Sequence, residues 1–180
     1  MFVMSSIHYL FPQDAEGAAE SHFPDLRGAH PKMLSLFEFW RSRCGERCFP
    51  KRSDFDVLEF APWMGNLSLV EPVDEGRDYR YRVHGTNKVD YLGRDLTGRC
   101  ISELPLEQAA IVKEEYDRVV ASGVPHFVNR PHINGDKDFL RTNKLMLPLS
   151  KDTAAVEIIL VGLYSWFGRI SADPISILGD

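Results

Sequence analysis

Basic and aromatic side chains alternate in one short stretch of the chain. Residues 78–84 read Asp-Tyr-Arg-Tyr-Arg-Val-His. In a strand, this pattern sends Arg80, Arg82 and His84 to one face and the tyrosines and valine to the other. An arginine can hold a carboxylate or phosphate through its bidentate fork, and a histidine can donate a hydrogen bond, titrate or bind a metal ion. This stretch is therefore a candidate for binding chemistry.

Other reactive residue types form no recognisable catalytic or metal-binding pattern. Cys44 and Cys48 have C-x-x-x-C spacing, without the second pair that a zinc site requires. They are either a redox pair or, as we favour, two ordinary reduced thiols. Glu114 and Glu115 are adjacent on an expected helix, where carboxylates usually form a solvated face. The sequence has no phosphate-binding loop, nucleophile elbow or H-E-x-x-H motif.

Composition narrows the classes of function. The chain has 180 residues, 44% of them hydrophobic, and a net charge of −5 from 21 Lys and Arg against 26 Asp and Glu. This acidic balance predicts no nucleic-acid partner. No apolar run approaches the roughly 20 residues of a membrane span, and the first residues do not resemble a signal peptide. Three cysteines favour a reducing, cytoplasmic location.

Hydrophobic periodicity predicts the elements that must position the binding residues. An apolar helix follows Pro31, a turn at Glu75-Gly76 joins two strands, and Asn134-Gly135 marks a second hairpin. The expected fold is α+β, with a five-stranded antiparallel sheet and helices segregated onto it. The remaining predicted elements are short helices within 50–65 and over 87–92, a long helix over 106–122, and strands over 66–72, 78–84, 126–133, 139–149 and 156–167.

These elements suggest four parts of the chain. Residues 1–29 are expected to be a flexible arm, and 30–49 an amphipathic helix that caps the sheet or forms a dimer. The main domain is expected over 50–168, followed by a tail over 169–180. Met33, Phe37 and Trp40 recur at helical spacing and are the predicted contacts to a second copy or a partner protein.

Two glycine-bounded motifs carry a family resemblance. The run from Tyr79 to Thr86, Tyr-Arg-Tyr-Arg-Val-His-Gly-Thr, precedes Gly-Arg-Asp-Leu-Thr-Gly-Arg at 93–99. Together they resemble a bacterial family of small, single-domain PAS proteins, and the resemblance extends over residues 31–167. It implies a sensory or regulatory fold that binds small molecules between the sheet and its central helices. It also implies dimerisation through a helix that precedes the core.

The resemblance also implies which residues line that interior site. It places Arg82 and His84 toward the cavity, although hydrophobicity alone would bury the tyrosine face of the same strand. The strand can bury its tyrosine face as well as the face of Arg82 and His84 if helices cover both faces of the sheet. Asn87 and Tyr91, on the short helix that follows, are the other predicted ligand-binding residues. A buried arginine must be paired, so Arg82 becomes a candidate anchor for an anionic ligand.

Each of these residues also has a purely structural interpretation. Arg82 could form an ion pair with Glu71 or Asp90, or be exposed. His84 could be a satisfied, half-buried residue. Asn87 and Tyr91 could serve local capping and core packing, which we slightly favour for both.

No cofactor is predicted, although an unidentified small molecule remains possible. Haem would need an axial ligand, and only His84 and His126 are plausible by position. The flavin photochemistry of some PAS relatives needs a cysteine on the central helices, and residues 85–98 contain none.

The sequence supports three functional hypotheses. We favour a non-enzymatic sensory module that binds a small molecule in an internal pocket and signals through a dimer or a partner protein. The alternative is a ligand-free dimerisation module built on the helix that contains Phe37, Phe39 and Trp40. A small cavity enzyme is a third reading, and only His84 and Asp90 could serve it.

Overall fold

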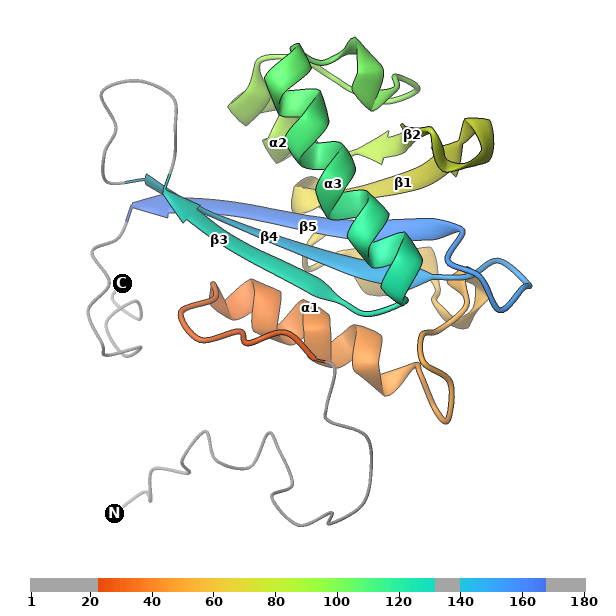
Figure 1. Ribbon diagram of the computed structural model, residues 1–180. Coiled ribbons are helices and arrows are strands. Elements are labelled where there is room, and N and C mark those ends of the chain that lie inside the picture. Colours follow the sequence, from red (N-terminus) through yellow and green to blue (C-terminus); the bar gives the residue numbers. More distant parts are fainter. Residues whose placement is uncertain (1–22, 132–139, 168–180) are drawn as a thin grey trace, which may run out of the picture.

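The computed structural model describes residues 23–131 and 140–167 (Figure 1). The predicted tail at 169–180, the Asn134-Gly135 turn and most of the predicted arm lie outside these residues. The helices are α1 (Pro31–Ser42), α2 (Thr86–Leu92) and α3 (Leu106–Ser122). The strands are β1 (Leu67–Val73), β2 (Asp78–His84), β3 (His126–Pro131), β4 (Leu140–Leu149) and β5 (Ile158–Phe167).

The strands form one antiparallel sheet in the order β2-β1-β5-β4-β3. The long strands β4 and β5 pair over ten residues in its centre. Helix α1 lies against one face of this sheet and α3 against the other (Figure 1). The predicted α+β class and five-stranded sheet are confirmed.

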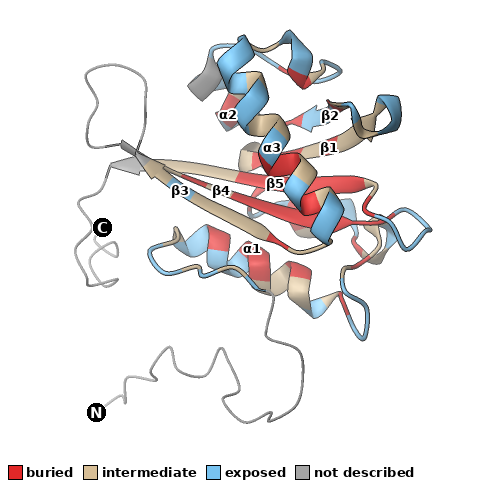
Figure 2. Ribbon diagram, viewed as in Figure 1, coloured by how far each residue is buried: buried red, intermediate tan, exposed pale blue. Residues whose placement is uncertain are grey.

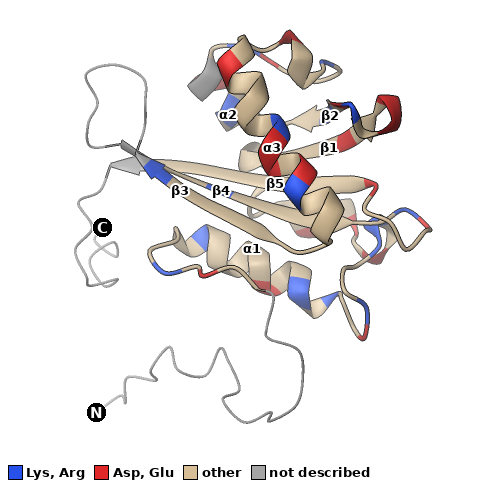
Figure 3. Cartoon of the chain, viewed as in Figure 1, with Lys and Arg blue, Asp and Glu red and all other residues tan. Residues whose placement is uncertain are grey.

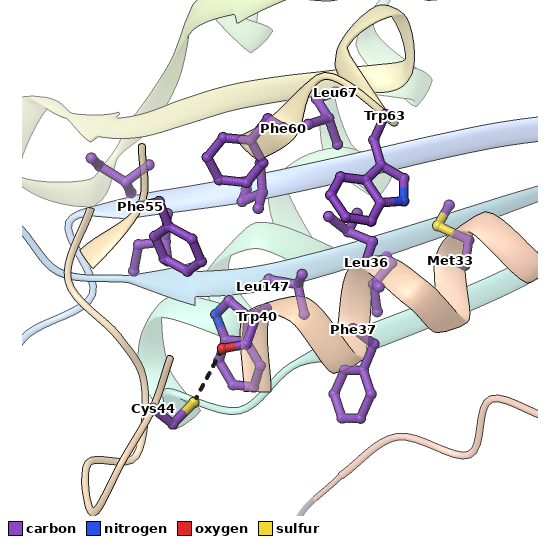
Figure 4. Packing of buried hydrophobic residues seen from close by; sticks show 14 residues of the cluster. Met33, Leu36, Phe37, Trp40, Cys44, Phe55, Phe60, Trp63, Leu67 and Leu147 are labelled. Carbon is purple, nitrogen blue, oxygen red and sulfur yellow. Dashed lines mark hydrogen bonds between the residues drawn. The ribbon is translucent and has the colours of Figure 1, made fainter. Parts of the chain in front are cut away.

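Helix α1 packs through an aromatic and aliphatic stripe. Pro31 occupies the first turn, and Met33, Leu36, Phe37 and Trp40 follow at helical spacing and are all buried. The Trp40 Nε1–H donates to the carbonyl of Pro148 on β4 at 3.0 Å, so the indole is buried with its polar atom satisfied. Figure 4 shows Met33 and Leu36 pointing from α1 toward the sheet, in the same hydrophobic cluster as Phe37 and Trp40.

Segment 43–66 extends this apolar layer. It forms short 3-10 turns, η2 (Arg52–Asp54), η3 (Val57–Phe60) and η4 (Met64–Asn66). Asp56 caps η3, because its side chain accepts a hydrogen bond from the Leu58 amide. The aromatic rings of this segment join the α1 cluster (Figure 4), and they are Phe55, Phe60 and Trp63.

Helix α3 covers the opposite face. Tyr116 and Val119 are buried against Val161 of β5 and the tyrosines of β2. The Tyr81 and Tyr116 hydroxyls lie 3.1 Å apart, and the Tyr79 hydroxyl donates to Asp117 at 2.7 Å. The helix ends where predicted, because Gly123 adopts the left-handed conformation that closes a helix.

A β-bulge changes the face assignment within β2. Leu69 of β1 pairs with Val83, but the next residue, Val70, pairs with Tyr81, so Arg82 is inserted without a partner. This insertion places His84 on the same face as Tyr81. Simple alternation had predicted the opposite arrangement.

The start of α2 depends on a close approach of two backbone segments. A Cβ atom at Gly85 would lie only 2.3 Å from the Gly65 carbonyl oxygen in η4. Glycine at 85 therefore lets the chain turn from β2 into α2 directly over η4. The helix begins at Thr86, one residue before the predicted start, and Gly85 occupies the cap position.

Candidate functional site: a buried basic cluster

The buried Lys, Glu and His side chains of the described chain lie on one face of the sheet. His84, Lys88 and Glu115 are buried, and the Lys144 side chain is only 14% exposed. They come from β2, α2, α3 and β4, and all lie on the side covered by α2 and α3. Elsewhere in the described chain charged residues concentrate on helices and loops, and the central strands are largely uncharged (Figure 3). Figure 2 shows that the buried residues of the sheet concentrate in β4 and β5, whereas β3 is largely intermediate.

Lys88 points inward because α2 is short and begins directly over the sheet. Its side chain is 4% exposed, whereas Thr86, Asn87 and Asp90 on the same helix face solvent. The Lys88 Nζ donates to Ser68 Oγ at 2.7 Å and to the Val161 carbonyl at 3.4 Å. No described Asp or Glu forms an ion pair with it.

Ser68 links Lys88 to His84. The Ser68 Oγ lies 3.2 Å from His84 Nδ1, so one hydroxyl joins the two basic groups. The other ring nitrogen, Nε2, is buried and has no hydrogen-bond partner in the described part of the chain. The imidazole packs edge-on against Tyr81, with ring centroids 5.3 Å apart. A buried polar atom without a partner is uncommon in a folded protein.

Burial sets the protonation of both basic groups. It holds the Lys88 pKa well below its usual range, and the nearby charge of Lys144 lowers that pKa further. Burial also lowers the His84 pKa to about 4, and Lys88 contributes in the same direction. His84 is therefore neutral at physiological pH, and only one of its ring nitrogens carries a proton.

The second lysine of the cluster has a carboxylate partner. Lys144 Nζ donates to Glu115 Oε2 at 2.7 Å and lies 4.4 Å from the Tyr116 ring centroid. Arg130 reaches the other Glu115 oxygen at 2.5 Å as an ion pair. Glu115 is thus held between two cations, which is the arrangement that a buried carboxylate requires.

Comparison with known proteins identifies the family. A family model described as a PAS domain matches residues 28–165. The chain belongs to the PAS domain family. No curated protein matches the chain. It is also similar to a sensory box sensor histidine kinase from Vibrio cholerae, with 14% identity and a TM-score of 0.39. That match covers 62% of this chain and 92% of the solved one.

As a PAS domain, the chain is in general terms a sensory or regulatory module. The matched residues include α1, so the family model extends over the helix as well as the sheet. In the described part of the chain no helix is long and apolar enough to cross a membrane. The same residues contain no group of three or more His, Cys, Asp or Glu side chains placed to bind a metal ion.

The position predicted for Arg82 in this PAS domain is wrong. Its side chain is 58% exposed, and its Nε lies 3.6 Å from the Glu71 carboxylate. The bulge in β2 is the physical reason that Arg82 and His84 do not share a face, because it moves His84 to the face of Tyr81 and leaves Arg82 on the opposite one. The structural alternative, an ion pair with Glu71, describes Arg82 as observed.

The other predicted ligand-binding residues have different placements. His84 is buried on the interior face as expected. Asn87 is exposed instead, and its Nδ2 donates to the side chain of Asn66 at 2.7 Å, which ties α2 to η4. The side chain of Tyr91 lies outside the described residues.

Met33, Phe37 and Trp40 do not offer a surface for a partner. All three are buried against the chain's own sheet, at 5% exposure or less. Their hydrophobic stripe predicted a covered face correctly, but that face is covered within the monomer. This finding corrects their assignment as dimer or partner contacts.

Sequence reasoning missed Lys88 and Lys144. A charged residue on a short helix is usually solvated, and so Lys88 was not considered. Lys144 did leave a signal, because it alternates with Met146, which is buried on the same face of β4.

Proposed function

We propose that this PAS domain is a sensory module that binds a small molecule at the buried basic cluster, defined as Ser68, His84 and Lys88 with Lys144 beside them. One observation carries the proposal: Lys88 is buried without a carboxylate partner in the described chain. An isolated buried charge is costly, so stability alone gives no reason to keep it. A bound molecule that contacts Lys88 and the free Nε2 of His84 would supply the missing partner.

Among the residues predicted from the sequence, His84 is retained in the proposed site and Tyr91 remains a candidate. Arg82 and Asn87 are not retained, because both are exposed and contact other parts of the chain. Asp90 is exposed as well, so it forms no buried acid and base pair with His84. We therefore favour a binding role over catalysis.

We propose that the module signals through a contact with a second copy of the chain or with a partner protein. Because the predicted dimer residues of α1 are buried, that contact must use other residues. Leu34 on the outer side of α1 is an exposed large hydrophobic residue and is available for such a role. We retain the cytoplasm as the proposed compartment, in keeping with three free thiols at Cys44, Cys48 and Cys100.

Native mass spectrometry of the purified chain, beside its denatured mass, tests the binding proposal. We expect an excess mass per chain that disappears on denaturation, and a smaller occupied fraction in the Lys88→Met variant. Absence of excess mass, together with no stabilisation by any compound in a thermal-shift screen of small metabolites, would contradict ligand binding. The proportion of dimer in the same native spectrum tests self-association.

A further inference from the structure

Two hydrogen-bond donors of the buried basic cluster have no acceptor among the described residues. The Lys88 ammonium has three N–H groups, and two of them are directed at Ser68 Oγ and the Val161 carbonyl. Because Ser68 Oγ accepts from Lys88, its own proton is free to bond His84 Nδ1. The neutral imidazole then carries its proton on Nε2, which has no partner. One N–H of Lys88 and the Nε2–H of His84 therefore remain without an acceptor among the described residues.

When Lys88 is protonated, the charges of the cluster are also unbalanced by one unit. Glu115 neutralises Lys144 inside the protein, and its second oxygen is paired with the partly exposed Arg130. Lys88 has no such carboxylate in the described chain. A ligand with a single negative charge would therefore balance the interior, whereas a dianion such as phosphate would leave an excess negative charge.

We propose that the small molecule bound under the proposed function is an organic monocarboxylate, whose carboxylate accepts hydrogen bonds from Lys88 Nζ and His84 Nε2. A carboxylate has two oxygens, which matches two donors on neighbouring elements. The surroundings are apolar, because Tyr81, Leu96 and Val161 belong to the cluster packed under α3. An organic tail suits these neighbours better than a hydrated inorganic ion does.

Protonation of Lys88 is consistent with this ligand. In the free protein burial and Lys144 hold the Lys88 pKa well below its usual range. A carboxylate beside the amine would raise that pKa again, because an opposite charge favours the charged form. The groups facing Lys88 from the sheet are Ser68, His84 and Lys144, and none of them is an anion.

Matched acids and amides test the inference on the unmodified protein. The probes are acetate, butyrate, hexanoate, benzoate and phenylacetate, each beside its neutral amide, with phosphate as the inorganic control. Backbone amide signals of Ser68, His84 and Lys88 would be followed by NMR during each titration. We expect saturable shifts from at least one acid, no comparable shifts from its amide, and none from phosphate.

Two variants test whether the ligand carboxylate contacts Lys88 and His84. Lys88→Met should weaken binding of the active acid by about 30-fold or more, because it removes the charged partner of a buried pair. Lys32→Met on the exposed side of α1, which covers the opposite face of the sheet, is the control and should leave the affinity unchanged. His84→Gln should weaken binding by a smaller factor, since the amide can still donate a hydrogen bond.

The outcomes separate this inference from the broader proposal. Equal binding of acid and amide, equal affinity in Lys88→Met, or no acid binding up to about 10 mM would overturn the carboxylate assignment. If native mass spectrometry then shows a neutral ligand at the cluster, the chain still binds a small molecule and only its class is wrong. If phosphate shifts the same signals as strongly, the site recognises anions in general and the organic assignment is overturned.

Discussion

The two faces of the sheet are built from different chemistry. Beneath α1 lies a layer of tryptophan, phenylalanine, leucine and methionine side chains (Figure 4). Beneath α2 and α3 the layer contains apolar residues as well, but also His84, Lys88, Glu115 and Lys144. Hydrophobic burial is the main source of folding free energy, whereas buried charges seldom add to it.

This contrast suggests a division of roles within one small domain. The α1 face supplies stability through a cluster of buried apolar side chains that contains no charged residue. The α2 and α3 face retains groups that lower stability unless something compensates them. Within that face the two lysines also differ, because Lys144 has a carboxylate and Lys88 has none in the described chain. Substitutions that act differently on the two faces can confirm or refute this division.

Truncation of the α1 face should have the largest effect. Trp40→Ala removes a fully buried indole and its hydrogen bond to Pro148, so the free energy of unfolding should fall by about 3–5 kcal/mol. Urea denaturation measures this loss. Leu106→Ala is the control, since Leu106 is 86% exposed and should change stability by less than about 0.5 kcal/mol. Similar losses in the two variants would show that α1 does not pack as described.

Removal of the Glu115 charge should have the next largest effect. Glu115→Gln leaves Lys144 buried without its carboxylate, and the free energy of unfolding should fall by about 3 kcal/mol. Glu114→Gln is the matched control, because Glu114 is a solvent-exposed neighbour that pairs with Arg118 on the surface of α3. An effect no larger than that of Glu114→Gln would contradict a structural role for the buried ion pair.

Acid should destabilise the protein through His84. Its pKa is about 4 in the folded chain against 6.5 for an ordinary histidine, so the unfolded chain binds a proton first as the pH falls. Stability is then greatest above pH 6.5 and declines toward pH 4. The wild type should lose about 2 kcal/mol more than His84→Gln across this window.

The difference between the two proteins is the informative quantity in that experiment. His30 and His126 also have lowered pKa values, so both contribute to the slope of each protein. Parallel stability curves for the wild type and His84→Gln, measured by urea denaturation at each pH, would show that His84 does not titrate as a buried group.

Replacing each of the two lysines should change the free energy of unfolding in opposite directions. Lys88→Met removes a buried amine without a carboxylate partner, so the ligand-free protein should gain about 1–2 kcal/mol. Lys144→Met should instead lose stability, because Glu115 keeps only Arg130 as its partner. Thermal unfolding of both variants gives the comparison. A loss in Lys88→Met as large as in Lys144→Met would mean that Lys88 is satisfied within the chain.

Periodicity in the sequence was sufficient to predict the fold. Local sequence patterns predicted three features that tertiary contacts did not override: the apolar stripe on α1, the apolar run of β5 and the glycine that ends α3. The family resemblance predicted the same fold. The interior site was predicted less well. His84 was placed correctly, but Arg82 was not, because the bulge in β2 depends on pairing with β1 and leaves no mark in the alternation.

Lys88 shows a second reason why site prediction falls short. Its burial results from the crossing of Gly65 and Gly85, which brings a seven-residue helix down onto the sheet. Nothing in the sequence indicated this role for Gly85, since a close approach between distant backbone segments cannot be deduced from one segment alone. Residue type therefore suggested solvent exposure for a lysine that the tertiary structure buries.

The protonation of Lys88 is the most direct test of an uncompensated basic site in this fold. NMR of the ligand-free protein with ¹³C-labelled lysine side chains would follow the Cε signal through a pH titration, with Lys88→Met used to assign it. We predict that Lys88 titrates well below the usual lysine value of 10.5, because burial and Lys144 both disfavour its charged form. Titration together with the exposed lysines would show that Lys88 is solvated or paired, and would contradict the account.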